Sequence, residues 1–176
     1  AKLRAEMMYN FGPCLSPTNA FHLLQGIETL PLRMQRHIEN TNALLSYLSA
    51  HDDVAWVRHP HLETHPQHEL AKRLMPKGAG SIITFGVKGG RDAGRAFIEA
   101  VELSSHLANV GDAKTLVIHP ASTTHSHIDP DAMKDGGLSD DMIRLSVGLE
   151  DIEDIKADFD VGFKAAKRLI APRAAE

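Results

Sequence analysis

The sequence predicts an α/β sandwich, in which helices cover one face of a small mixed or antiparallel sheet. Segments with apolar residues near the helical period of 3.6 alternate with short apolar segments typical of strands, in the order α-β-α-β-α-β-β-α-β-α. Short links around Gly111 suggest that part of the sheet is antiparallel, because hairpin loops join antiparallel strands. With 176 residues, of which 43% are hydrophobic, the chain is long enough to bury one core.

A long helical pattern follows the turn-rich residues 10–16. Ser16 or Thr18 can cap its beginning, and Pro17 is tolerated in the first turn. Pro31 lies inside the pattern and should kink it or divide it into two helices. We expect one buried face, because apolar residues recur near the helical period at Phe21, Leu24, Ile27, Leu30, Met34, Ile38, Leu44, Leu45 and Leu48.

The middle of the chain predicts two strands, each followed by a helix. Residues 54–57 form a short apolar strand, and a polar loop then leads to a helix over residues 66–74. Glycines bracket the next strand, residues 81–87. Residues 91–103 have the helical period, and four of them should face inward: Ala93, Phe97, Ala100 and Val101.

The last third of the chain predicts three strands and two helices. Two short strands, residues 106–110 and 115–119, flank Gly111. A short helix over residues 130–137 ends at glycine. Residues 142–147 alternate as a strand, and residues 152–170 have the period of a final amphipathic helix.

Composition argues against several classes of partner. A net charge of −4 and a pI near 6.3 give no basic surface for nucleic acid. No apolar run approaches the ~20 residues of a membrane span, and no signal segment opens the sequence, so we expect no membrane partner. The single cysteine, Cys14, cannot form an internal disulfide, which fits a reducing cytoplasm.

Arg144 is the first candidate for a binding residue. It lies between Ile143 and Leu145 on an apolar strand, where a charged side chain needs a reason. Its planar guanidinium matches a carboxylate in bidentate fashion. The alternative is a strand arginine that points to solvent or pairs with an acid such as Asp140 or Asp141.

Asn109 is the second candidate. Its amide can donate to a carboxylate, and the nearby Gly111 lets the backbone approach a ligand closely. The alternative is ordinary turn chemistry, because asparagine is common before a bend that contains glycine.

Other clusters favour structural roles. The histidines of residues 119–127 match no zinc spacing, and the loop's hydroxyls can satisfy local backbone groups. The cluster His59, His61, His65 and His68 is best explained by solvated histidines, because Pro66 interrupts the helix start. Cys14 precedes a helix and is better explained by structure than by catalysis. The glycine pairs near residues 78–80 and 88–90 do not form a phosphate loop.

Residues 111–125 and 143–151 together resemble the C-terminal part of the Cys/Met-metabolism family of pyridoxal-phosphate (PLP) enzymes, and are most similar to the O-acetylhomoserine sulfhydrylases. The resemblance covers residues 3–170 and implies the C-terminal domain of the aspartate-aminotransferase-like fold, type I. It implies that Arg144 binds the α-carboxylate of an amino-acid substrate. Asn109 would help to hold that carboxylate, and Thr124 is the expected contact from the loop that lines the pocket.

The resemblance also implies what this chain does not supply. The family's cofactor lysine lies in a Ser-x-Thr-Lys-like segment, and no lysine here has that context; Lys114, the most similar, would lie on a surface hairpin. Residues 1–16 would be the end of a large cofactor domain and its linker, and residues 17–176 the substrate-binding domain with its connecting helix. We therefore expect a C-terminal fragment with no catalytic, cofactor-binding or metal-binding residue, inactive without the N-terminal cofactor domain.

In the intact enzyme, the resemblance implies a cytoplasmic homotetramer of methionine biosynthesis that binds PLP and converts O-acetylhomoserine and sulfide to homocysteine and acetate. Two alternatives remain open. The chain can belong to another family member, of the cystathionine γ-synthase or methionine γ-lyase type. It can also be a non-catalytic module that binds carboxylates or docks to a partner.

Overall fold

The computed structural model describes residues 1–170, which form two compact units divided after Arg33. The first unit begins with a short π-helix, η1 (Leu3–Met8), and α1 (Tyr9–Phe11), followed by α2 (Pro17–Glu28). Ser16 caps α2 as expected, because its Oγ accepts a hydrogen bond from the Asn19 backbone N–H at 3.2 Å. Pro17 occupies the first turn, where its missing N–H costs nothing.

The apolar side chains of α2 are exposed. Phe21, Leu24 and Ile27 are 58%, 59% and 61% exposed, and Leu30 is 42% exposed. The prediction of a continuous buried face is therefore wrong for this part of the helical pattern. A helix buries an apolar face only against a second apolar layer, and the residues of the first unit do not form one.

The second unit contains the sheet. Pro31 divides the long helical pattern as expected, because α2 ends at Glu28 and the next helix begins at Leu30. Among residues 1–170, no helix is both long enough and apolar enough to cross a membrane. The remaining elements are α3 (Leu30–Ala50), β1 (Val54–Arg58), α4 (His68–Leu74), β2 (Ile82–Val87), α5 (Gly90–Ala100), β3 (Ser105–His106), β4 (Leu116–Ile118), the 3-10 turn η2 (Pro120–Ser122), α6 (Pro130–Asp135), β5 (Met142–Ser146) and α7 (Ile152–Ile170).

The five strands form one mixed sheet in the order β1-β2-β5-β4-β3. The pairs β1–β2, β2–β5 and β4–β5 are antiparallel. The expected hairpin around Gly111 is wrong, because β3 and β4 are parallel and Ser105 pairs with Leu116. These strands are so short that residues 107–115 suffice to return the chain to the same end of the sheet, whereas longer parallel strands need a longer crossover.

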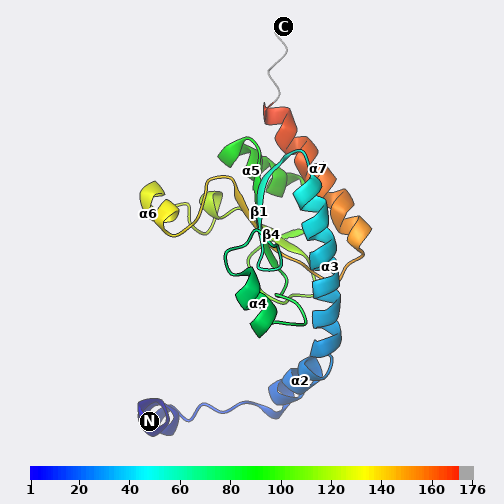
Figure 1. Ribbon diagram of the computed structural model, residues 1–176. Helices are drawn as coiled ribbons and strands as arrows, with labels where there is room; N and C mark the ends of the chain where they lie inside the picture. Colours follow the sequence, from blue (N-terminus) through cyan, green and yellow to red (C-terminus); the bar gives the residue numbers. More distant parts are fainter. Residues whose placement is uncertain (171–176) are drawn as a thin grey trace. The chain divides into compact units, whose positions relative to one another are not determined.

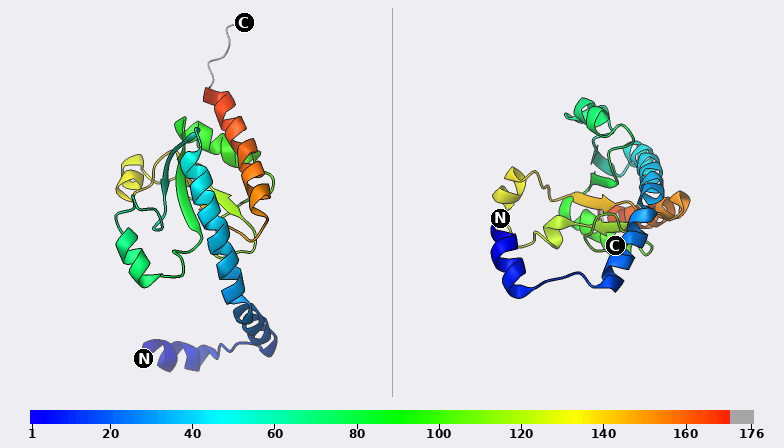
Figure 2. Two further views of the ribbon diagram at one scale, coloured as in Figure 1. Left: turned by 45° about the vertical axis from the view of Figure 1, so that its right-hand side comes forward. Right: turned by 90° about the horizontal axis from the view of Figure 1, so that it is seen from below.

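Helices α3, α5 and α7 pack on one face of the sheet. The core combines Leu44 of α3, Phe97 of α5 and Phe159 of α7 with inward residues of β2 and β5, such as Phe85 and Leu145. Figures 1 and 2 show α3 and α7 side by side, and the Tyr47 hydroxyl of α3 donates to Asp160 of α7. In the same views α4 and α6 stand away from this helical layer.

α5 ends three residues before the predicted Leu103. The carboxylate of Asp158 in α7 accepts hydrogen bonds from the backbone N–H groups of Glu102, Leu103 and Ser104, at 2.7, 3.0 and 2.9 Å. Because these amides bind Asp158 and not carbonyls of their own helix, α5 stops at Ala100.

Candidate functional site

Arg144 lies in the middle of β5, the central strand of the sheet. Its cross-strand neighbours are Thr84 of β2 and Ile118 of β4. Ile143 and Leu145 are fully buried beneath the helices. Side chains alternate along a strand, so Arg144 points to the face away from the helical layer, where it is half-buried.

Arg144 has a carbonyl partner. Its Nη2 donates to the backbone carbonyl of Asn109 at 3.4 Å, so two of the predicted residues lie together. The alternative of an ion pair with Asp140 or Asp141 is not found: within the described chain, none of the salt bridges includes Arg144. Asp141 instead accepts a hydrogen bond from Trp56 Nε1 at 2.8 Å. The guanidinium therefore keeps donors for an anionic ligand.

Asn109 lies in the exposed loop after β3, and its side chain takes part in a turn. Its Oδ1 accepts from the Val110 N–H at 2.8 Å, and its Nδ2 lies 3.5 Å from Asp112 Oδ2. Gly111 follows with a positive φ of 75°, which glycine adopts without strain. The turn chemistry considered as an alternative is present, and the backbone carbonyl of Asn109 is the group that meets Arg144.

Thr124 lies in the exposed part of the loop after β4. Its hydroxyl is 2.8 Å from His125 Nδ1, and the His125 N–H donates to the Pro120 carbonyl at 2.9 Å. The loop begins one residue after Ile118, the cross-strand neighbour of Arg144. The role of Thr124 as a substrate contact stays a prediction.

His119 organises the beginning of this loop, a role that the sequence analysis gave only in general terms. Its ring is fully buried, with Nδ1 at 2.8 Å from Ser122 Oγ and Nε2 at 2.7 Å from the Asp140 carbonyl. Burial lowers the pKa of His119, so the ring is neutral. Arg91 of α5 adds a hydrogen bond to the Ala121 carbonyl at 2.8 Å.

A second polar cluster, which no sequence motif pointed to, holds the other end of β5. Arg36, His37 and Asn40 of α3 donate to the backbone carbonyls of residues 147–150. His37 Nδ1 lies 2.6 Å from the first of these carbonyls, and Asn40 Nδ2 lies 3.0 Å from two others. The available signal was a row of polar residues in register with the buried leucines of the same helix.

In the second histidine cluster the expectation of solvated side chains is wrong for His59, which is buried, whereas His61 is exposed and His65 and His68 are half-buried. The ring of His59 accepts the N–H of His61 at Nδ1, and His68 Nδ1 lies 3.1 Å from the Pro60 carbonyl. Burial lowers the pKa of His59 to about 4. These histidines close the loop between β1 and α4, and in the described chain no three His, Cys, Asp or Glu residues are placed to hold a metal ion.

Gly89 follows β2 and precedes α5, so the glycine run at residues 88–90 lies between a strand and a helix. The Ile170 side chain of α7 fills the space that a Cβ on Gly89 would enter. This close approach and the positive φ of 104° both require glycine at this position.

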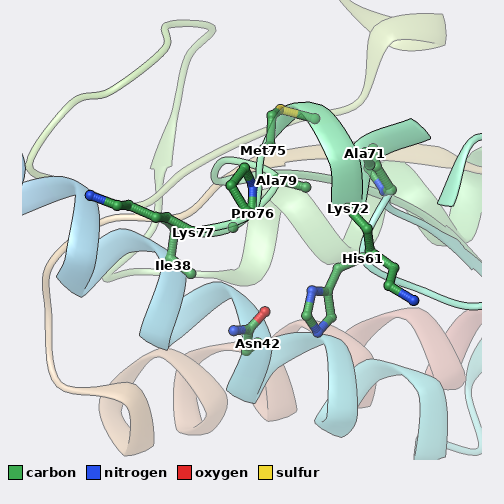
Figure 3. Close-up of a pocket in the computed structure, with 11 residues that line it drawn as sticks. Ile38, Asn42, His61, Ala71, Lys72, Met75, Pro76, Lys77 and Ala79 are labelled. Carbon is green, nitrogen blue, oxygen red and sulfur yellow. The ribbon is translucent and has the colours of Figure 1, made fainter. Parts of the chain in front are cut away.

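Figure 3 shows a hollow of about 310 Å³ at a different place, between α3, α4 and the loop before β2. Ile38, Pro76 and Met75 supply apolar walls, and the lysines Lys72 and Lys77 extend from opposite sides. Lys72 already pairs with Glu69 of its own helix at 3.2 Å. None of the predicted substrate residues lines this hollow.

Comparison with known proteins identifies the family. The family model for "Cys/Met metabolism PLP-dependent enzyme" matches residues 1–164. O-acetyl-L-homoserine sulfhydrylase 1 of Thermus thermophilus is 48% identical over 157 residues, which are 89% of this chain and 37% of that protein. The chain thus spans well under half the length of the curated relatives that it matches.

Solved structures have the same fold. An O-acetylhomoserine (thiol)-lyase from Campylobacter jejuni aligns with a TM-score of 0.84 and 34% identity, over 93% of this chain and 39% of that one. Cystathionine γ-synthase from Xanthomonas oryzae in complex with cystathionine aligns with a TM-score of 0.82 and 36% identity, over 96% of this chain and 44% of that one. The chain therefore belongs to the Cys/Met metabolism family of PLP-dependent enzymes and has the fold-type-I architecture of its C-terminal part.

Proposed function

We propose that this chain forms the substrate-carboxylate-binding part of a PLP-dependent O-acetylhomoserine sulfhydrylase. One observation carries the proposal: Arg144 lies half-buried on the central strand and has no ion-pair partner among the described residues. A guanidinium in that position binds a carboxylate with two parallel hydrogen bonds. Three curated relatives at 43–48% identity are O-acetyl-L-homoserine sulfhydrylases, which supports this member of the family.

In this proposal Arg144 holds one end of the amino acid while its reacting carbons extend beyond the strand. The Asn109 carbonyl fixes the guanidinium from one side, which leaves the remaining N–H donors for the ligand. Thr124 closes the pocket from the loop after β4. Such orientation lowers the entropic cost of reaction, because the substrate is held in one pose.

PLP, when bound in the intact enzyme, supplies the electron sink for replacement of the acetoxy group, which leaves as acetate, by sulfide. The glycines of this chain give little support for a cofactor cradle, because the Ile170 side chain lies against Gly89 and Gly78 already donates its N–H to the Met75 carbonyl. We therefore propose that residues outside this chain hold the cofactor, within a homo-oligomer of the intact enzyme, and that the chain alone is inactive. Residues 1–16 are proposed to complete the cofactor domain.

Binding of O-acetyl-L-homoserine to the chain tests the role of Arg144. We expect the Nε–H resonance of Arg144 and the backbone amide resonance of Asn109 to shift saturably in a nuclear magnetic resonance titration, and the amide resonance reports the affinity of every variant. Arg144→Ala should weaken binding about 10- to 100-fold, because hydrogen bonds to a charged group are lost. The control is Arg95→Ala, which removes an exposed arginine of α5 that pairs with Glu99. Equal affinity of all three proteins would contradict the proposal.

A PLP titration, with borohydride trapping and mass spectrometry of the intact chain, tests whether residues outside this chain hold the cofactor. We expect no trapped adduct, because the lysine that binds the cofactor lies outside this chain. A stoichiometric adduct on one lysine, abolished when that lysine is changed to alanine, would show that the chain holds the cofactor itself.

The choice between sulfhydrylase and γ-synthase is tested by the acceptor thiol. Cystathionine γ-synthase is the second candidate, because its fold aligns with this chain nearly as well, at a TM-score of 0.82. For the chain joined to a relative's cofactor portion, we expect homocysteine from O-acetylhomoserine and sulfide. Cystathionine as the main product when cysteine is supplied would assign the chain to the γ-synthases. No turnover together with a carboxylate-dependent shift would favour a binding module.

A further inference from the structure

His119 makes two hydrogen bonds that fix the tautomer of its neutral ring. The Asp140 backbone carbonyl, 2.7 Å from Nε2, can only accept, so Nε2 carries a proton. Burial lowers the pKa of His119 and so favours the neutral ring, in which Nδ1 accepts the Ser122 hydroxyl at 2.8 Å. The donor and the acceptor of the ring are thus each used by a different segment of the chain.

The surroundings of the ring hold it in one place. Gly94 of α5 lies against it, and a Cβ at that position would come within 2.8 Å of the ring atoms Cδ2 and Nε2. Arg91, Asp140 and Asp141 are the charged groups near the ring, and burial outweighs them in lowering the pKa of His119. A side chain confined in this way transmits the position of one partner to the other.

The two partners of His119 belong to the two parts of the proposed carboxylate site. Ser122 lies in the loop that carries Thr124. Thr123 Oγ1 of the same loop donates to the His119 carbonyl at 2.8 Å. Asp140 lies two residues before β5, the strand of Arg144. The loop and the strand thus share one buried ring as their common contact.

We propose that His119 is a positioning residue, which sets the loop of Thr124 against the strand of Arg144 through its bonds to Ser122 and Asp140. The inference rests on the proposed function, because the pocket that His119 shapes is the carboxylate pocket. Thr124 closes over the ligand only when the loop is held in this register.

Two variants of the chain, Ser122→Ala and His119→Gln, each remove the bond between the ring and Ser122 and leave a donor for the Asp140 carbonyl. Ser122→Ala removes the loop bond and leaves the half-buried position filled, whereas Ser122→Thr keeps the hydroxyl. His119→Gln keeps an amide donor for the Asp140 carbonyl but loses the ring acceptor. Ser126→Ala is the matched control, because Ser126 is an exposed hydroxyl of the same loop.

The measurement is the affinity for O-acetyl-L-homoserine, followed at the Arg144 Nε–H and the Thr124 amide, together with the melting temperature. We expect Ser122→Ala and His119→Gln to weaken binding about 3- to 10-fold, roughly one hydrogen bond's share. Ser122→Thr should restore it and Ser126→Ala should leave it unchanged. The melting temperature of Ser122→Ala should stay near that of the wild type. A purely structural role of the bond would instead lower the melting temperature together with the affinity.

Two results would overturn the inference and are distinguishable. If the wild type binds through Arg144 but Ser122→Ala and His119→Gln bind equally well, His119 positions nothing and the proposed function stands. If no binding depends on Arg144, the proposed function and this inference both fail.

Discussion

At the scale of single residues, Asp158 shows how one carboxylate decides a local structure. It is 8% exposed, and its two oxygens accept three consecutive backbone N–H groups, those of residues 102–104. A carboxylate with three such bonds replaces the carbonyls that a longer α5 would supply. The turn after α5 is thereby tied to α7.

Asp158→Ala should lower the free energy of unfolding by about 3 kcal/mol, because partly buried N–H groups lose their acceptor. Urea denaturation measures the change. The control is Asp154→Ala on the exposed face of the same helix, where the loss should stay near 0.5 kcal/mol. Similar losses for both variants would show that the three hydrogen bonds contribute little.

At the scale of elements, α5 and α7 meet through aromatic rings and a glycine. Phe97 of α5 lies 4.8 Å from Phe163 and 5.4 Å from Phe159, measured between ring centroids. Gly162 of α7 faces the Phe97 ring, and a Cβ there would lie 2.7 Å from it. The missing side chain therefore sets how closely the two helices approach.

Gly162→Ala should lower the free energy of unfolding by about 1 to 3 kcal/mol, since overpacking outweighs the gain in helix propensity. Phe97 is fully buried and has no room to move. The same substitution at Gly26 of α2, where a Cβ meets nothing within 4 Å, should raise helicity slightly. Urea denaturation and far-ultraviolet circular dichroism measure the two effects; a gain in stability at Gly162 would contradict the packing.

Hydrogen bonds from Asn40 join α3 to the residues that follow β5. Asn40→Ala should lower the free energy of unfolding by about 2 kcal/mol, because the Gly148 and Glu150 carbonyls lose a donor. Asn42→Ala, two residues further along α3 on the wall of the hollow in Figure 3, should change it by less than about 0.5 kcal/mol. Chemical denaturation of the two variants decides whether the hydrogen bonds of Asn40 stabilise the end of β5.

At the scale of the whole molecule, the stability of the second unit should depend on pH through His59. Its pKa is about 4 in the folded chain and near 6.5 when unfolded. Above pH 6.5 both states are neutral and the contribution is complete. As the pH falls from 6.5 toward 4, the unfolded state binds a proton that the folded state does not, so stability falls.

We expect the free energy of unfolding to decrease by about 3 kcal/mol across this window. His59→Asn is the matched variant, because an Asn oxygen can accept the His61 N–H in the same turn and does not titrate. Urea denaturation at a series of pH values should give a shallower slope for the variant. An identical slope in both proteins would place the titrating group elsewhere.

Much of this fold could be predicted from the sequence because local periodicity reports local structure. The final helix begins and ends at the predicted residues, and Pro31 divides the long helical pattern as expected. The prediction failed where a partner lies far along the chain. No local signal gives the parallel pairing of β3 and β4, the exposure of Phe21, or the burial of His59.

The candidate site divides in the same way. The sequence by itself determined the family and pointed to Arg144, because an arginine between apolar strand residues is a local pattern. Only the tertiary structure decided that the Asn109 backbone meets Arg144, that His119 joins the Thr124 loop to β5, and that α3 holds the strand end. The physical reason is distance along the chain: these partners lie up to 114 residues apart, so folding alone brings them together.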